Sequence, residues 1–172
     1  MKIAGYVQDS IVDGPGLRFT LFVQGCPHGC PGCHNPETHD INGGQELTPA
    51  DVISLMLSNP WTDGLTLSGG EPFAQPDSCA EIARAAKAHG LSIWAYSGYT
   101  IEQLLQLPSP AVAELLSLCD VLVDGPFLLA QRSLSLRWRG SANQRVLDVP
   151  ASLVAGHAVT LSGYEMVPSG QK

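Results

Sequence analysis

LRFTLFVQGCPHGCPGCHN, residues 17–35, joins an apolar strand to a loop that holds three cysteines. The first part, LRFTLFVQG (17–25), is rich in apolar and β-branched residues and ends at a glycine, which is typical of a buried strand. The second part spaces Cys26, Cys30 and Cys33 as C-x3-C-x2-C, with prolines and glycines in most of the gaps. Because glycine accepts positive φ and proline presets its own φ, this loop can turn sharply enough to aim several thiols at one place.

The whole chain has the composition of a globular protein. Of its 172 residues, 44% are hydrophobic and 15% are charged, which is enough apolar material for a substantial core. The net charge of −7 gives no general attraction for nucleic acid or anionic lipid. No apolar run approaches the ~20 residues of a membrane span, and the N-terminus lacks the apolar stretch of a signal peptide. We therefore expect a cytoplasmic protein with reduced thiols, without nucleic-acid or membrane partners.

Strands and helices alternate along the chain after the cysteine loop. Helices are expected at 48–57, 77–90, 100–107 and 109–118. Further strands are expected at 64–70, 91–98 and 121–125, with weaker strands at RVLDV and HAVTL near 145–161. Asp77 is expected to open the second helix and Gly90 to close it. One unit per ~30 residues indicates parallel strands joined by right-handed crossovers.

This order predicts an α/β fold, either a partial (β/α) barrel that is open on one side or an open doubly wound sheet. The units are too few for a closed eight-stranded barrel, which takes about 250 residues. We expect a single domain over 1–172, with a core of about 6–162 and a disordered tail of about 163–172. In either arrangement the chemistry collects at the carboxyl ends of the strands. The cysteine loop, SGGEP, YSGYT and DGPF each follow a strand, so we expect them at one rim.

Three kinds of site fit the clustered cysteines. A structural zinc site needs four ligands, and His28 or His34 would have to supply the fourth from within the same tight loop. A disulfide with a spare thiol is disfavoured in a reducing compartment. A four-iron, four-sulfur cluster held by three cysteines leaves one iron without a protein ligand. Such an iron can bind a substrate or a cofactor.

The C-x3-C-x2-C loop after a first strand resembles the defining motif of the radical S-adenosylmethionine (SAM) superfamily, whose fold is a partial β/α barrel. SGGEP (68–72) resembles the superfamily's GGEP motif, which contacts the methionine amino group of SAM. The resemblance implies one [4Fe-4S] cluster bound by Cys26, Cys30 and Cys33, with the open iron binding SAM. In this superfamily, one electron from the reduced cluster cleaves SAM into methionine and a 5′-deoxyadenosyl radical, which abstracts a hydrogen atom.

The resemblance also implies a set of residues that bind SAM. Glycines at 69 and 70 would let the backbone approach the ligand, and the Glu71 carboxylate would complement an ammonium group. Ser97 would contact the ribose or the methionine carboxylate. Asp124 would contact SAM or an associated cation, or would only belong to an Asp-Gly turn. The expected cofactor-binding residues are therefore Gly69, Gly70, Glu71, Ser97 and Asp124.

Longer segments resemble one group within the superfamily. DSIVDGPGLRFTLFVQGC (9–26) resembles the glycyl-radical-enzyme activases, whose hallmark is VDGPGxR before the first strand. CPHGCPGCHNPET (26–38), VLVDGPF (121–127) and RGSANQRV (139–146) resemble the activases of anaerobic ribonucleoside-triphosphate reductase. The resemblance covers about residues 6 to 148. It implies that the deoxyadenosyl radical abstracts a hydrogen from a backbone glycine of the reductase, with a low-potential donor such as flavodoxin supplying the electron.

Other functions remain as alternatives. A pyruvate formate-lyase-type activase shares VDGPG, but it is longer and typically carries a lysine where this chain has Pro126. A pterin-to-deazapurine radical SAM synthase is also small, but VDGPG is not its pattern. A non-catalytic, metal-stabilised docking subunit would use the cysteines without radical chemistry. Iron and sulfide content separates this last alternative from the activases.

Four polar residues have two expected roles each. Asp13 and Arg18 flank a Pro-Gly turn, where they would dock the partner's glycine loop or lock the turn itself. Asn143 and Arg145 would face the partner or form a structural bracket at the end of the barrel. Cys79 and Cys119 are expected to be small buried apolar residues rather than ligands.

Overall fold

The computed structural model describes residues 1–164 of the chain. Its strands are β1 (Lys2–Ser10), β2 (Arg18–Val23), β3 (Gln45–Glu46), β4 (Gly64–Gly69), β5 (Ser92–Tyr96), β6 (Val121–Asp124) and β7 (Arg145–Asp148). Its α-helices are α1 (Pro49–Met56), α2 (Pro76–Ala88), α3 (Ile101–Gln106), α4 (Pro110–Leu118) and α5 (Val149–Ala155). Short 3-10 helices follow the cysteine loop, β4 and β6: Pro36–Thr38, Pro72–Ala74 and Leu129–Gln131.

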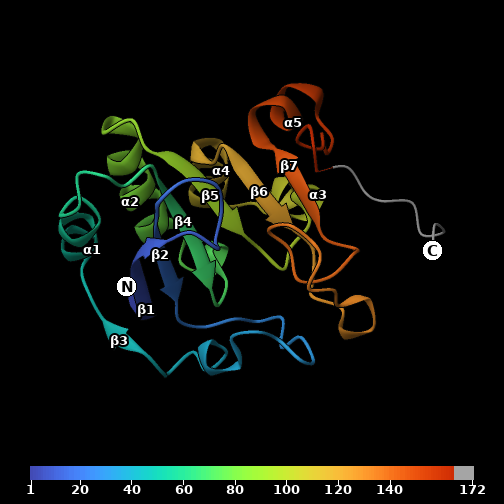
Figure 1. Cartoon of the computed structure of the whole chain (residues 1–172), viewed down its shortest axis with the longest axis horizontal. Coiled ribbons are helices and arrows are strands. Elements are labelled where there is room, and N and C mark those ends of the chain that lie inside the picture. The colour runs from blue at the N-terminus through green and yellow to red at the C-terminus, as the bar shows by residue number, and fades with distance from the viewer. Residues whose placement is uncertain (165–172) are drawn as a thin grey trace.

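All seven strands form one open sheet in the order β3-β1-β2-β4-β5-β6-β7 (Figure 1). β2, β4, β5 and β6 are parallel neighbours, and they follow one another in chain order. A doubly wound sheet would reverse its winding direction in the middle. Because no reversal occurs, the partial barrel is the arrangement observed, and the prediction of an α/β fold with an open side is confirmed.

Alternate residues of the parallel strands face two environments. One set packs against the helices in the main core, to which every described α-helix contributes. The residues of this set are Phe19, Leu21, Val23, Leu65, Leu67, Ile93, Ala95 and Leu122. Cys79 and Cys119 also lie in this core, as predicted, and burial raises the pKa of both thiols. The other set faces the concave side, where a smaller apolar cluster forms around Trp94, Val121, Val123 and Val146. The rest of the concave side is left open for a site.

Helix ends agree with the local signals at most positions. Thr48 caps α1 in a capping box with Asp51, and Ser109 caps α4. Helix α2 differs from the prediction because it begins at Pro76, so that Asp77 lies in the first turn and is not the opening residue. Proline at the first helical position lacks an N–H that would otherwise be unpaired there. Gly90 follows the helix with φ 74, as predicted.

Both edges of the sheet depart from the predicted parallel pattern. β1 was not predicted, and it pairs antiparallel with β2 through the VDGPG turn. β7 is antiparallel to β6, and HAVTL forms only a bridge between Thr160 and Leu147. β1 mixes good strand formers, such as Tyr6 and Val7, with Gly5, Gln8 and Asp9, which are poor ones. Its local propensity is therefore weak, and its pairing depends on β2. Of the predicted tail, residues 165–172 lie outside the described residues, whereas Tyr164 is described and contacts Trp94 and Trp138.

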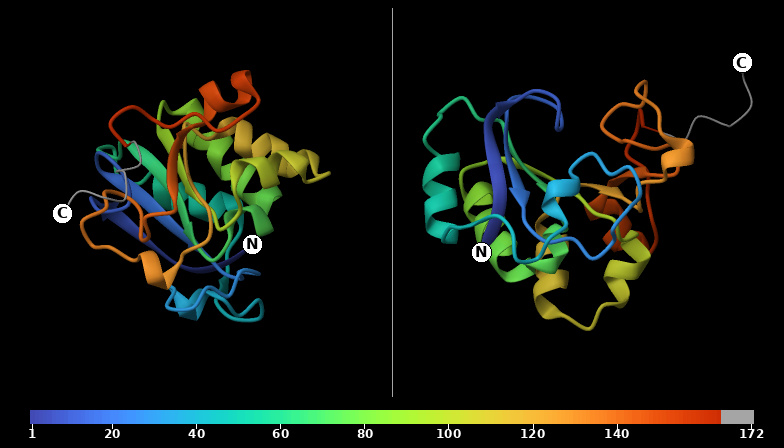
Figure 2. Two further views of the ribbon diagram at one scale, coloured as in Figure 1. Left: turned by 90° about the vertical axis from the view of Figure 1, so that its right-hand side faces the viewer. Right: turned by 90° about the horizontal axis from the view of Figure 1, so that it is seen from below.

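Two loops from distant parts of the sequence lie side by side at the carboxyl ends of the strands. The cysteine loop follows β2, and the loop of residues 125–144 follows β6 (Figure 2). They touch where the His34 ring lies 5.1 Å from the Phe127 ring, and Gly32 packs against Leu129. None of the α-helices in residues 1–164 is long and apolar enough to cross a membrane.

Candidate functional site

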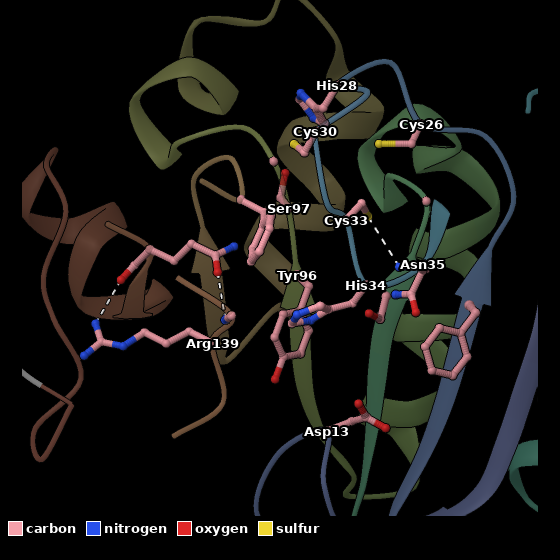
Figure 3. Close-up of a pocket in the computed structure, with 18 of the residues that line it drawn as sticks. Asp13, Cys26, His28, Cys30, Cys33, His34, Asn35, Tyr96, Ser97 and Arg139 are labelled. Atoms are coloured by element: carbon pink, nitrogen blue, oxygen red, sulfur yellow. Dashed lines mark hydrogen bonds between the residues drawn. The ribbon is translucent and has the colours of Figure 1, made fainter. Parts of the chain in front are cut away.

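An open cavity of about 570 Å³ lies on the concave face of the sheet, at the carboxyl ends of its parallel strands (Figure 3). Seven of the residues singled out in the sequence line it: Asp13, Cys26, Cys30, Cys33, Gly69, Gly70 and Ser97. Five others do not: Arg18, Glu71, Asp124, Asn143 and Arg145. The structure thus brings the cysteine loop, the Gly-Gly segment and the β1–β2 turn around one space, and it directs several predicted ligand-binding side chains elsewhere.

The cysteine loop is a sequence of tight turns with all three thiols on the cavity wall. Gly29 and Gly32 have φ values of 55 and 73, in the left-handed region that other residues rarely adopt. The Cys33 N–H donates to the Cys30 carbonyl at 3.1 Å. The Asn35 N–H donates to the Cys33 sulfur at 3.4 Å. Partial burial raises the pKa of Cys26, so its thiol needs an electropositive partner to ionise at neutral pH.

The donor set fits a cluster better than a single metal ion. No three His, Cys, Asp or Glu side chains in residues 1–164 converge on a common point, which a mononuclear zinc site would require. In a four-iron cluster each thiolate binds a different iron, so the sulfurs must stand apart. Cys26, Cys30 and Cys33 are partly exposed and line the open cavity, where such a cluster would have space.

The Gly69–Gly70 backbone packs against β2 so closely that side chains have no room there. A Cβ at Gly69 would lie 2.6 Å from the Phe22 Cα, and one at Gly70 would lie 2.3 Å from the Gly25 carbonyl oxygen. The Gly70 N–H donates to the Val23 carbonyl at 2.8 Å. The peptide groups of this segment therefore reach the cavity directly, beside the cysteine loop.

Glu71 is held by hydrogen bonds behind the cavity wall. Its side chain is 1% exposed and does not line the cavity. The carboxylate accepts hydrogen bonds from the Ser97 hydroxyl at 3.0 Å, from the Gly98 N–H at 2.9 Å and from the Phe73 N–H at 3.1 Å. It also pairs with His28 Nε2 at 2.8 Å. All these bonds are made inside the protein, and the contact of Glu71 to the ammonium group of a ligand stays a prediction.

Ser97 and Asp124 are also held by internal bonds. The Ser97 hydroxyl donates to Glu71 and accepts the Tyr99 N–H at 3.1 Å, although the residue still borders the cavity. Asp124 is fully buried, and its carboxylate accepts from Arg145 at 2.5 and 2.9 Å and from the Ile101 N–H at 2.8 Å. Asp124 thus forms an internal ion pair with Arg145, and its contact to a ligand or cation stays a prediction.

Arg145 is the centre of a bracket between β6, β7 and α3. Besides Asp124, its guanidinium binds both oxygens of Glu102, at 3.1 and 2.8 Å. These hydrogen bonds lower the pKa of Glu102 to about 2 and raise the pKa of Arg145. Asn143 donates to the Pro126 carbonyl at 2.8 Å. Of the two expected roles, these contacts correspond to the structural bracket.

Arg18 and Asp13, which were expected to dock the partner's glycine loop or to lock the β1–β2 turn, have different surroundings. Arg18 is fully buried and donates to the carbonyls of Pro15, Leu65 and Ser92 and to two hydroxyls, so it locks the turn and cannot reach a partner. Asp13 lines the cavity, and its Oδ2 accepts from the hydroxyls of Ser10 and Thr20 at 2.5 and 3.2 Å. Its carboxylate is thus fixed in place at the cavity wall.

Several cavity residues were not assigned a role from the sequence. Tyr96 projects from the end of β5 toward the region of Asp13 (Figure 3), and burial raises the pKa of its phenol. Phe127, Trp138 and Gln144 complete the wall from the loop after β6. Alternate side chains of a strand face the same side of a sheet. This alternation along β5 was the sequence signal that could have placed Tyr96 on the concave face. Phe127 and Gln144 lie in VLVDGPF and RGSANQRV, so the resemblance of these segments to the reductase activases was the available signal for them, whereas Trp138 lies outside both.

Comparisons with known proteins agree with this site. The family model for a 4Fe-4S single cluster domain matches residues 12–147. The "anaerobic ribonucleoside-triphosphate reductase-activating protein" of Escherichia coli K12 is 39% identical over 157 residues, covering 85% of this chain and 97% of the relative. Proteins of the same name match from Salmonella typhi, at 38% identity with coverages of 85% and 97%, and from Enterobacteria phage T4, at 38% with coverages of 78% and 86%.

A solved structure, QueE from Escherichia coli, matches 58% of this chain and 53% of its own, with a TM-score of 0.48 and 16% identity. At that score the match does not bear on function. The family model and the relatives together cover most of the chain, and they include the cysteine loop and the strands that surround the cavity. The chain belongs to the family of anaerobic ribonucleoside-triphosphate reductase-activating proteins, and it contains a 4Fe-4S single cluster domain.

Proposed function

We propose that this protein generates a glycyl radical on an anaerobic ribonucleoside-triphosphate reductase. The observation that carries the proposal is the shared cavity. Three cysteine thiols, a Gly-Gly backbone with no room for side chains, and the fixed Asp13 carboxylate surround one open space. The name that the relatives share supplies the target enzyme.

Cys26, Cys30 and Cys33 would hold three irons of one [4Fe-4S] cluster, leaving the fourth iron to SAM. When both are bound, the reduced cluster supplies one electron that breaks the sulfonium S–C5′ bond, and the resulting deoxyadenosyl radical takes a hydrogen atom from a glycine Cα. The Gly69 and Gly70 peptide groups would bind the methionine end of SAM. Asp13 would accept hydrogen bonds from the partner's main chain.

The open side of the barrel suits a substrate that is itself a protein loop. The cavity lies between the β1–β2 turn and the loop after β6, and apolar side chains at both places are exposed: Ile11 and Val12 on the first, Leu129 and Leu134 on the second. A glycine Cα needs no general base to lose a hydrogen atom, so positioning is the main task of the protein here. We further propose a cytoplasmic location and a low-potential donor such as flavodoxin.

Anaerobic reconstitution tests the proposal. The protein would be loaded with iron and sulfide, reduced, and mixed with SAM and the reductase, and 5′-deoxyadenosine and the EPR spectrum would be recorded. We expect deoxyadenosine together with a glycyl-radical doublet on the reductase. Cys30→Ala should abolish cluster-dependent cleavage of SAM while the far-UV circular dichroism stays unchanged, because the loop lies outside the core.

The outcomes separate the alternatives. A doublet on pyruvate formate-lyase and none on the reductase would move the assignment to that activase. Iron-free protein after careful reconstitution would favour a docking subunit without radical chemistry. Retained cleavage in Cys30→Ala would refute the cluster ligands proposed here.

A further inference from the structure

His28 lies in the middle of the cysteine loop, between Cys26 and Cys30, and its side chain is 16% exposed and borders the cavity. The ring is packed edge-on against Tyr99, with ring centroids 4.5 Å apart and an angle of 74°. Its Nε2 lies 2.8 Å from Glu71 Oε2. The histidine thus connects the loop to the segments that follow β4 and β5.

The segment after β5 is shaped to receive this ring. A Cβ on Gly98 would lie 2.3 Å from His28 Cδ2, so a residue with a side chain at position 98 would displace the imidazole. The same glycine donates its N–H to Glu71 Oε2 at 2.9 Å. The lack of a side chain at position 98 therefore makes room for the ring, and the backbone there binds its partner.

Glu71 is fixed independently of His28. The Ser97 hydroxyl and the Phe73 and Gly98 N–H groups hold its carboxylate, and these residues come from the sheet side of the site. Within residues 1–164, the bond from His28 to Glu71 is the one hydrogen bond that joins segment 27–34 to a residue beyond Asn35 or before Cys26. The remaining loop bonds are local turns. This bond therefore links the loop to the sheet, together with the packing of the His28 ring on Tyr99.

We propose that His28 is a positioning residue that holds the three cysteines in place for the iron–sulfur cluster through the buried Glu71 carboxylate. The inference rests on the proposed function only for the identity of the bound group. In the protein without iron, His28 keeps the loop ordered. In the loaded protein, it slows the loop motions that release iron.

Two measurements test this role without using activity. Hydrogen exchange of iron-free protein reports the order of residues 27–34, and iron release to a chelator from anaerobically reconstituted protein reports retention. We expect His28→Ala to speed both by about tenfold, in keeping with the loss of one hydrogen bond to a charged group. His28→Gln, which retains an N–H donor, should restore part of the difference. His157→Ala is the matched control, since within residues 1–164 the side chain of that exposed histidine has one hydrogen-bond partner, the Ala155 carbonyl at 3.1 Å.

Gly98→Ala strains the same contact from the opposite side and should mimic His28→Ala, which keeps the test decisive if His28→Ala folds poorly. Exchange and iron release at wild-type rates in both variants would overturn the inference. Faster exchange without any rescue by His28→Gln would also overturn it, because packing alone would then explain the effect. Failure of the wild-type protein to take up a cluster would count against the proposed function, while hydrogen exchange of the iron-free variants would still decide the role of His28.

Discussion

Two buried charged side chains, Arg18 and Glu71, lie at opposite ends of the same parallel strands. Arg18 begins β2 and is paired in register with Gly64 at the start of β4. Glu71 comes two residues after the end of β4. Both side chains are almost completely buried, and each is bonded by groups from several segments of the chain.

The partners of the two side chains differ in kind. Arg18 donates to carbonyls and hydroxyls of the turn and strands beneath the open cavity, and burial lowers its pKa to about 10. Glu71 accepts from loop backbone and from His28, which belongs to the cysteine loop. Arg18 therefore joins segments at the amino end of the barrel, whereas Glu71 binds the cysteine loop, which must hold a ligand. We infer that the first serves stability and the second serves the site.

Replacing Arg18 should have the largest effect on stability. Arg18→Met removes five hydrogen bonds and leaves buried acceptors such as the Leu65 carbonyl with fewer donors. We expect the free energy of unfolding to fall by about 3–5 kcal/mol in urea titrations. The exposed Arg84, paired with Glu114, provides the control, and Arg84→Met should cost less than about 1 kcal/mol. Equal losses of unfolding free energy in Arg18→Met and Arg84→Met would show that the buried hydrogen bonds of Arg18 contribute no more to stability than an exposed ion pair does.

Replacing Glu71 should lower the stability less than replacing Arg18 does, and it should weaken the retention of iron more. Glu71→Gln puts an amide N–H₂ where the carboxylate accepts hydrogen bonds, so we expect a loss of about 1–3 kcal/mol of unfolding free energy. Iron release from the reconstituted protein should nevertheless be faster than in Arg18→Met, measured on the folded fraction. Glu114→Gln, at a partly exposed carboxylate, is the control. Greater iron loss in Arg18→Met than in Glu71→Gln would contradict the inference that Arg18 serves stability and Glu71 serves the site.

Glu102 sharpens the comparison because its side chain is 45% exposed. Arg145 lowers its pKa from 4.5 to about 2, so the bond contributes stability above about pH 4.5 and loses it as the pH falls toward 2. Glu102→Gln should therefore lower the unfolding free energy at pH 7 by about 1 kcal/mol or less. The difference from wild type should shrink between pH 4.5 and 3. A difference that stays constant over this range would mean that charge is not its source.

The sequence by itself determined the order of strands and helices and the presence of the cysteine loop. Alternating apolar residues mark the parallel strands, and capping residues such as Thr48 and Ser109 mark helix starts, because these signals act within a few residues. Glycines at 69 and 70 were expected to let the backbone approach a ligand. The structure shows their close approach to the backbone of Phe22 and Gly25, and the approach to a ligand stays a prediction. The edge strands were missed or misassigned, because their pairing depends on neighbours and not on local propensity.

Only the tertiary structure decided what the polar residues do. Glu71, Asp124 and Arg18 stand in or beside motifs that suggested contacts to a ligand or a partner, yet each side chain is bonded inside the protein. His28, considered from the sequence only as a zinc ligand, connects the cysteine loop to the sheet. A short motif fixes which groups are present, whereas burial and the partners of a charge are set by segments dozens of residues apart. Because a buried charge must be hydrogen-bonded, the fold selects its partners.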